Sequence, residues 1–224
     1  MRIQKNDSRE MKIMEESKSN DWDSYWSKRK KQTFFTKLQD KIHREIVYNK
    51  HINLAVKYSK KGTIIDFGSG IAEVSILLAE KRGDKIIAVD FSDNALHIAK
   101  DLAKRKNIGL KAYKHNINKE FHHKKVELCW NIGTIEHFKN PLHIINNMKA
   151  LSNTVIVIIP MKHLFRDIYE LFKRFANLHC KGYYHPMKKK ELVTIFKQAG
   201  FKNIYAYSYF IFGCVPFLAV IGKL

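Results

Sequence analysis

The sequence predicts an α/β protein built on a doubly wound, mostly parallel sheet. The stretch 63–91 reads as a short apolar run, a glycine turn, a helical pattern and a second apolar run, which together form one strand–helix–strand unit. Both of its strands end in an acid, Asp66 and Asp90. Further short apolar runs alternate with helical patterns along the chain, and such alternation is typical of parallel sheets whose strands are joined by helices.

The region before the first strand is predicted to be helical, with a polar tail ahead of it. Residues 1–20 are polar and highly charged, so they are expected to be disordered or loosely attached, and they lack the apolar core of a secretory leader. Residues 21–60 are expected to form an N-terminal helical cap. Its main helix, over 33–58, carries an apolar stripe and ends before Gly62.

The glycine turn of the first unit predicts a nucleoside site. Gly68 and Gly70 let the backbone approach a ligand closely at the carboxyl edge of a parallel sheet, where such folds bind nucleosides. Asp90 follows the turn at the spacing of an acid that hydrogen-bonds a ribose diol. A dinucleotide fingerprint has a small residue in the sixth position of this turn, whereas Glu73 stands here and would repel a diphosphate. Because Asp66 adds a second negative charge, the pocket is predicted to take an adenosine that carries a cationic amino-acid end and no phosphate.

The central part of the chain supplies the remaining parallel strands and their helices. Ser92 or Asp93 is the expected N-cap of the helix after the second strand. β-Branched residues dominate the fifth strand, and a proline ends it. The expected elements are a helix over 93–106, a third strand over 109–113, a fourth strand over 126–131, a helix over 141–151 and a fifth strand over 154–159.

The last part of the chain is predicted to contain an insertion, a helix and a closing hairpin. The insertion spans 161–186, and within it residues 164–178 have the apolar spacing of an amphipathic helix with a basic polar face. A helix over 187–199 follows. The apolar tail is expected to form two antiparallel strands over 203–210 and 217–221 rather than a membrane span, because glycine and proline interrupt it and β-branched and aromatic residues fill it.

Three sequence motifs together resemble one enzyme family. They are D-F-G-S-G-I-A with V-D-F-S in the first unit, G-T-I-E-H-F after the fourth strand, and H-P followed by A-G-F before the sixth strand. They resemble the class I S-adenosylmethionine-dependent methyltransferases, and the second motif resembles the small-molecule branch that includes quinone-biosynthesis enzymes. The resemblance covers residues 60–224. It implies a Rossmann-like, seven-stranded sheet with an antiparallel last strand in a three-layer α/β/α sandwich, and one methyltransferase domain over 21–224.

The resemblance implies a cofactor, S-adenosylmethionine, and a set of residues that bind it. The glycine turn and the acid before it would cradle the methionine end, Asp90 would hold the ribose hydroxyls, and Gly133 would leave room near the methyl group. Phe91 and Ile117 would lie against the adenine faces. Asn116 would accept a hydrogen bond at the adenine edge, where the family often has Asp. The full expected set is Asp66, Phe67, Gly68, Ser69, Gly70, Asp90, Phe91, Asn116, Ile117, Asn131 and Gly133.

Methyl transfer in this family is an in-line displacement, and the sequence offers three candidates for a catalytic side chain. His137 is the first candidate for a general base, because it follows the fourth strand and a neutral imidazole is poised near neutral pH. His185, beside the insertion, is the second. Each could instead be a structural histidine, and Glu136 could brace the site as well as take a proton. His122 and His123 lack a third ligand at sensible spacing, so no metal site is expected.

Two segments are expected to flank the acceptor side of this site. Trp22, Tyr25 and Trp26 share one helical face, where they would either fasten the N-terminal arm to the domain or form a flap over the acceptor pocket. The basic amphipathic helix at 164–178 would form a lid over the acceptor or lie on a membrane surface. The family resemblance favours a lid, so the whole insertion, 161–186, is interpreted as a lid insertion.

The chain is strongly basic, with 41 Lys and Arg against 21 Asp and Glu and a formal net charge of +20. Thirty-three of the basic residues are lysines spread along the whole chain, whereas phosphate binding favours arginine forks or a concentrated stripe. Solvated lysine-rich surfaces are one explanation, and a functional basic face for RNA, lipid headgroups or an acidic substrate is the other. Three scattered cysteines indicate reduced thiols and a cytoplasmic setting.

Two classes of function follow from these features. The first is a methyltransferase that acts on a small or amphipathic, lipid-like acceptor, which the segment after the fourth strand and the apolar insertion helix favour. The second is an RNA methyltransferase, or a catalytically silent protein on the same fold that binds RNA or a membrane surface, which the charge favours. No N-P-P-(Y/F) sequence is present, so amino-methylation of adenine, cytosine or glutamine by that route is not expected. Neither the acceptor nor the oligomeric state follows from the sequence.

Overall fold

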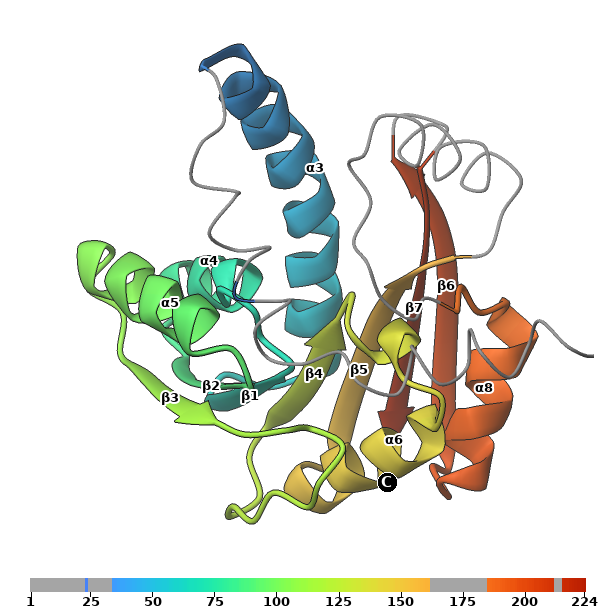
Figure 1. Cartoon of the computed structure of the whole chain (residues 1–224). Helices are drawn as coiled ribbons and strands as arrows, with labels where there is room; N and C mark the ends of the chain where they lie inside the picture. Colours follow the sequence, from blue (N-terminus) through green and yellow to red (C-terminus); the bar gives the residue numbers. More distant parts are fainter. Residues whose placement is uncertain (1–22, 24–33, 162–184, 212–214) are drawn as a thin grey trace, which may run out of the picture.

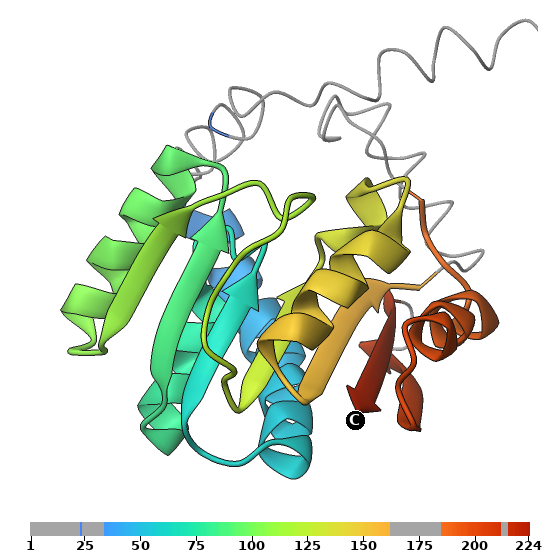
Figure 2. The ribbon, with the colours of Figure 1, turned by 90° about the horizontal axis from the view of Figure 1, so that it is seen from below.

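The computed structural model describes Asp23 and residues 34–161, 185–211 and 215–224, and in these residues one sheet lies between two layers of helices (Figure 1, Figure 2). The predicted N-terminal tail, the aromatic cluster at 22–26 and the predicted insertion helix lie outside the described residues. What the sequence predicts for these three segments therefore stays a prediction.

The described residues form a sheet of seven strands in the order β3-β2-β1-β4-β5-β7-β6. Strands β1 to β5 run parallel to one another, whereas β7 lies between β5 and β6 and runs antiparallel to both. The predicted doubly wound, mostly parallel sheet with an antiparallel last strand is confirmed. The strands are β1 (Thr63–Phe67), β2 (Lys85–Asp90), β3 (Leu110–Lys114), β4 (Leu128–Ile132), β5 (Thr154–Pro160), β6 (Asn203–Ile211) and β7 (Val215–Lys223).

Helices cover both faces of the sheet, which confirms the predicted three layers. Helices α3, α4 and α5 lie on one face, and α6 and α8 lie on the other (Figure 1, Figure 2). Among the helices that the structure describes, none combines the length and the apolar character needed to cross a membrane. The helices are α3 (Phe34–Tyr58), α4 (Glu73–Arg82), α5 (Asp93–Arg105), the 3-10 helix η1 (Ile135–His137), α6 (Pro141–Leu151) and α8 (Lys189–Gln198).

Several strand boundaries differ from the prediction, and the largest shifts are at β4 and β7. Val126 is predicted to open the fourth strand, but it forms only an isolated bridge with Ser152, and β4 begins later in the chain. Pro216 is predicted to lie in the joining turn, but β7 includes it, opposite Phe210. The Pro216 carbonyl accepts a hydrogen bond from the Met161 N–H at 3.1 Å, on the β5 side, and the Phe210 carbonyl accepts one from Lys50 Nζ at 3.0 Å.

The central strands are buried on both faces, as expected of a parallel sheet between helices. On the face that α6 and α8 cover, Phe67 and Val157 share a cluster with Phe196. On the other face, Trp130 packs in a cluster with Leu78 of α4. All five side chains are fully buried. A core on each face therefore fixes the positions of the carboxyl ends of the central strands.

We expect the substitution Gly222→Ala to lower the free energy of unfolding by roughly 1–3 kcal/mol. A Cβ atom on Gly222 would lie 2.6 Å from Phe201 Cγ and 2.7 Å from Phe196 Cδ1, inside the core that α8 covers. Urea unfolding followed by circular dichroism measures the change. Gly109→Ala is the matched control, since no described atom lies within 4 Å of a Cβ at that position. An equal loss of stability in the two variants would contradict the packing argument.

Candidate active site

The loop between β1 and α4 has a backbone conformation that favours glycine. Gly68 has a φ of +83° and Gly70 one of +50°, and Ala72, with a φ of +52°, is also left-handed. A Cβ atom on Gly68 would lie 2.8 Å from Thr134 Cγ2. The loop after β1 and the segment after β4 therefore approach each other more closely than a side chain at position 68 allows.

Two side chains, one near the end of β4 and one in the segment after it, hold this loop in place. Asn131 is fully buried; its Nδ2 donates to the Phe67 carbonyl, and its Oδ1 accepts from the Ile135 N–H at 3.0 Å. Thr134 Oγ1 donates to the Gly68 carbonyl at 2.9 Å. The sequence predicts Asn131 as a cofactor-binding residue, and its observed side-chain bonds join β1 to β4. The sequence analysis does not assign a role to Thr134, although this residue lies in the G-T-I-E-H-F motif, which could have indicated one.

The acid at the end of β2 is bonded to the glycine loop. Asp90 Oδ2 accepts from the Gly70 N–H at 2.8 Å, and Oδ1 accepts from the Ser92 N–H at 2.9 Å. Burial raises the pKa of Asp90. Asp23 contacts the residues that follow Asp90. It accepts hydrogen bonds from the Ser92 hydroxyl and, at 3.2 Å, from the Asn94 N–H. The N-terminal cap therefore touches the expected ribose end of the site, which no sequence pattern indicates.

Asp66, which is predicted to help cradle the methionine end, faces the interior beneath the loop. Its Oδ2 accepts from the Ser75 hydroxyl at 2.7 Å, and Trp130 Nε1 donates to the same hydroxyl oxygen at 2.9 Å. Burial, with a smaller contribution from repulsion by Asp90, raises the pKa of Asp66 to about 7. The carboxyl is thus tied to α4 through Ser75, an arrangement that the sequence does not reveal.

The residues expected around an adenine differ in exposure. Ile117 is buried in the core on the α6 face, whereas Phe91 is half-buried. Asn116 is exposed, and its Oδ1 accepts from the Asn118 N–H at 3.0 Å. This contact is a local turn in which an Asn side chain bonds the backbone two residues later. The Asn116 amide is therefore bonded within its own loop.

Two of the catalytic candidates, Glu136 and His137, follow β4, and the third, His185, meets Glu136 through its backbone. Glu136 is buried, and its backbone carbonyl accepts from the His185 N–H at 2.8 Å. A Cβ atom on Gly133 would lie 3.8 Å from Glu136 Oε1. His137 is half-buried at the end of η1. His185 Nε2 lies 2.9 Å from Glu191 Oε1 of α8, and both side chains are partly exposed, so this imidazole is already engaged.

A buried histidine that sequence reasoning misses lies at the carboxyl end of β5. His51 of α3 is 1% exposed, and its ring centroid lies 5.4 Å from that of Phe217 and 6.1 Å from that of Tyr209. Phe217 pairs with Pro160, the last residue of β5. Within the described part of the chain, neither ring nitrogen of His51 nor the Tyr209 hydroxyl has a hydrogen-bond partner. Burial lowers the pKa of His51 to about 3 and raises that of Tyr209, so both are uncharged at neutral pH.

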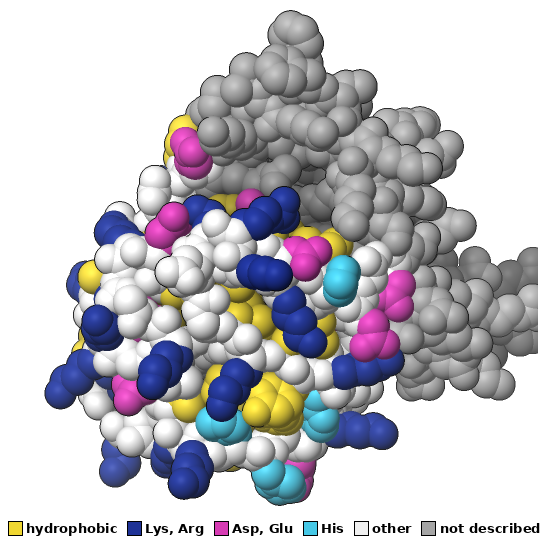
Figure 3. All heavy atoms as spheres, turned by 90° about the vertical axis from the view of Figure 1, so that its left-hand side faces the viewer, with side chains coloured by type: hydrophobic (Ala, Val, Ile, Leu, Met, Phe, Trp, Pro, Cys, Tyr) yellow, Lys and Arg dark blue, Asp and Glu magenta, His cyan; other side chains and the backbone are white. Residues whose placement is uncertain are grey.

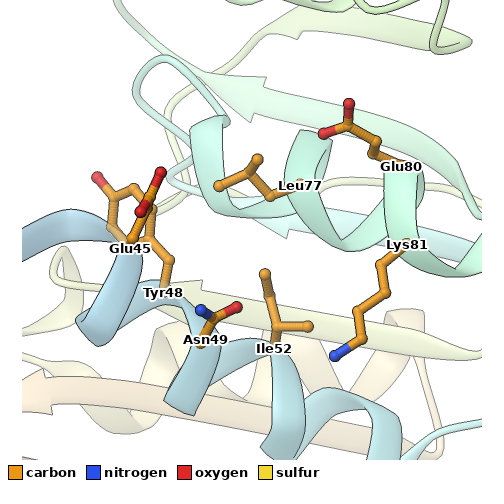
Figure 4. Close-up of a pocket in the computed structure, with 7 residues that line it drawn as sticks. All are labelled: Glu45, Tyr48, Asn49, Ile52, Leu77, Glu80 and Lys81. Atoms are coloured by element: carbon orange, nitrogen blue, oxygen red, sulfur yellow. The ribbon is translucent and has the colours of Figure 1, made fainter. Parts of the chain in front are cut away.

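A surface pocket of about 320 Å³ lies between α3 and α4 (Figure 4). The Tyr48 hydroxyl on its wall donates to Glu73 Oε2 at 3.1 Å, in the first turn of α4. The pocket runs along the flanks of two helices and not at the carboxyl ends of the strands, so we do not assign the cofactor to it. Its lining residues are Glu45, Tyr48, Asn49, Ile52, Leu77, Glu80 and Lys81.

The sheet topology, the glycine loop at the end of β1 and the acid at the end of β2 define a nucleoside-binding α/β domain. A family model described as a methyltransferase domain matches residues 25–206. The chain belongs to this family, within the class I S-adenosylmethionine-dependent methyltransferases, and the cofactor of the family is S-adenosylmethionine. The resemblance that the sequence motifs indicate is thus confirmed. No curated protein shows significant sequence similarity to the chain.

Solved structures share the fold at low sequence identity. Magnesium protoporphyrin IX methyltransferase (ChlM) from Synechocystis PCC 6803 with bound SAH has a TM-score of 0.64 and 14% identity, over 86% of this chain and 89% of that one. A chain of the complex between the Haloferax volcanii Trm112 methyltransferase activator and a methyltransferase has a TM-score of 0.67 and 14% identity, over 90% and 96%. The methyltransferase domain of bacterial CtHen1-CN has a TM-score of 0.58 and 18% identity, over 81% and 100%. At these identities the likeness concerns the fold alone.

Asp66→Asn is expected to stabilise the protein by an amount that depends on pH. Because the pKa of Asp66 is raised from 3.8 to about 7 in the folded state, the carboxyl contributes stability that is fully present below pH 3.8 and is lost as the pH rises to about 7. The amide does not ionise, so the advantage of the variant grows across this window, by about 1.4 kcal/mol per pH unit, and levels off above it. Urea unfolding at several pH values measures the difference. Asp101→Asn, at an exposed carboxyl of α5, is the control; a pH-independent effect of Asp66→Asn would contradict the buried position of its carboxyl.

Proposed function

We propose that the chain transfers a methyl group from S-adenosylmethionine to a small or amphipathic acceptor. The observation that carries the proposal is the glycine loop, where a Cβ atom on Gly68 would clash and where Asp90 is bonded to the loop backbone. The carboxylates of Asp66, Glu73 and Asp90 stand before, after and beside this loop. The charges of Glu73 and Asp90, and that of Asp66, which is about half ionised at neutral pH, disfavour a diphosphate. They suit a nucleoside whose other end carries a sulfonium and an ammonium group.

The site residues divide by the part of the cofactor that each would hold. Asp66, Phe67 and Asn131 would act from beneath, because their bonds to Ser75 and across β1 and β4 fix the loop in place. The other residues would contact the cofactor from the loops above. These are Gly68, Ser69 and Gly70 at the methionine end, Asp90 at the ribose, and Phe91, Asn116 and Ile117 around the adenine.

The protein's own contribution to the reaction is alignment. When bound, S-adenosylmethionine supplies a methyl group on a good leaving group, so the acceptor needs to be held in line with it. Gly133 lacks a side chain that would fill the space after β4, and its N–H donates to the Ile158 carbonyl at 2.8 Å, which fixes this turn on β5. Holding two reactants in such an arrangement can account for ~7–11 kcal/mol of barrier.

Among the three catalytic candidates, we assign the general base to His137. His137 directly follows the segment after β4, where the methyl group is expected, whereas His185 lies beside α8 with its imidazole bonded to Glu191. Glu136 is buried and its carbonyl holds the His185 backbone, which supports a bracing role for it. A histidine that takes a proton from a hydroxyl or acidic carbon of the acceptor would contribute about 10²–10⁴-fold in rate.

The surroundings of the site support an acceptor of low charge. The cluster of His51, Tyr209 and Phe217 at the end of β5 is aromatic and uncharged at neutral pH. The face that carries α5 and β3 has lysines dispersed among other side chains rather than gathered in one stripe (Figure 3). Dispersed lysines favour the small acceptor over the two rivals, an RNA methyltransferase and a catalytically silent protein that binds RNA or a membrane surface. The net charge of +20 is the feature that supports these two alternative functions.

Calorimetric titration with S-adenosylmethionine tests the proposal directly. We expect saturable binding to the wild-type protein and no response to NAD. Asp90→Ala should weaken binding at least tenfold, because it removes the acceptor for the Gly70 N–H and the expected ribose contact. Asp101→Ala, an exposed acid on the neighbouring helix, should bind as the wild type does. A protein that binds neither ligand, or an Asp90→Ala variant that binds normally, would overturn the assignment.

A further inference from the structure

The described sheet ends in two edge strands of opposite character. β3 carries two lysines, Lys111 and Lys114, whereas the nine residues of β6 include no charged residue and no proline. Natural edge strands usually carry charges, prolines or bulges, because an open edge offers unpaired N–H and C=O groups to another strand. In the described part of the chain, no strand lies beyond β6. The β6 strand therefore carries no protecting charge or proline of its own. Lys50 of α3 reaches its edge, where Nζ donates to the Phe210 carbonyl at 3.0 Å, a bond that the N–H of a partner strand would replace.

Burial does not explain the uncharged sequence of β6. Tyr205 is 42% exposed and Phe210 is 40% exposed, and Ser208 between them is also exposed. Of the 224 residues, 41 are Lys or Arg, yet none of them falls in this strand. Exposed aromatic and β-branched residues in so basic a chain are typical of a strand that pairs with another one.

The edge is already shaped for pairing, because β6 is held along its whole length. Every residue of β6 is in register with a residue of β7. On one face, Tyr205 and Tyr207 contact Tyr58 of α3, with ring centroids 4.9 and 6.0 Å apart. On the other face, Ile204 and Ala206 pack against the core that α8 covers. A partner strand would thus meet a preformed template.

We propose that β6 is a homotypic interface, at which two copies of the chain pair their β6 strands antiparallel about a two-fold axis. The two seven-stranded sheets would then form one continuous sheet across the dimer. A second copy fits this edge because an antiparallel pair of identical strands is self-complementary. The dimer would leave the carboxyl ends of β1, β2 and β4 accessible, since β5 and β7 separate these strands from β6 in the sheet.

The sequence of β6 selects one register for this pairing. If Tyr207 faces Tyr207 of the second copy, all nine residues are paired, and residues directly opposite lie on the same face of the sheet. Tyr205 then faces Tyr209, and Ile204 faces Phe210, which are the aromatic and apolar pairs that stabilise antiparallel strands. Because each copy carries a net charge of +20, salt should strengthen the dimer by screening the repulsion.

Sedimentation equilibrium of the full chain at micromolar concentrations tests the proposal. We expect a dimer for the wild type and at least a tenfold weaker dimer for Tyr205→Lys and for Ser208→Lys, because each places a charge on the edge. Tyr113→Lys is the matched control, since Tyr113 is a 40%-exposed tyrosine on the other edge strand. Circular dichroism confirms that each variant is folded. A monomeric wild type, or a dimer that resists both β6 variants, would overturn the proposal.

A cysteine cross-link tests the register. In a background with Cys180→Ser and Cys214→Ser, Tyr207→Cys should form a disulfide-linked dimer on mild oxidation, because directly opposite Cα atoms in an antiparallel pair lie within disulfide reach. Tyr205→Cys in the same background faces a tyrosine and should cross-link far more slowly. Equal cross-linking of the two variants would overturn the register centred on Tyr207.

Discussion

The rest of the site depends on one steric constraint, the close passage of the loop after β1 beside the segment after β4. This passage leaves no room for a Cβ atom on Gly68, and Asn131 and Thr134 join the two segments by hydrogen bonds. β1 and β4 are neighbours in the sheet although β2 and β3 come between them in the chain, so this is the point where the strand order reverses. A crevice opens at such a switch point, and here its floor is made of backbone held by short side chains.

The local electrostatics of the site oppose those of the whole chain. Asp66 and Asp90 are almost fully buried at one edge of the sheet, where O–H and N–H donors of Ser75, Gly70 and Ser92 stabilise them. A neutral O–H or N–H donor stabilises a carboxylate without cancelling its charge, whereas a bonded lysine would neutralise it. The carboxylate can therefore still attract a cationic ligand. A chain with a net charge of +20 therefore keeps a small negative corner in which a cationic cofactor is favoured.

The sequence predicts the fold well because the spacing of apolar residues that marks a strand or a helix is a local property of the chain. It locates the glycine loop and Asp90 for the same reason, since the chemistry of a nucleoside site fixes their spacing along the chain. It does not predict that Asp66 turns to Ser75, because this depends on how α4 packs over β1. His51 gives no signal at all, since its surroundings come from β6 and β7, far along the chain. The roles of the catalytic candidates depend on an acceptor that no sequence pattern identifies.

The place of β7 in the sheet has a consequence for the order in which the chain folds. β7 follows β6 in the chain but lies between β5 and β6, so β6 has no neighbour in the sheet until β7 has paired with β5. Before that pairing the nine uncharged residues of β6 have both edges free, and an apolar segment of this kind is prone to aggregate. A chaperone that holds extended apolar segments would protect the chain at this stage. The last two strands are therefore expected to join the sheet together, as a hairpin that closes onto β5.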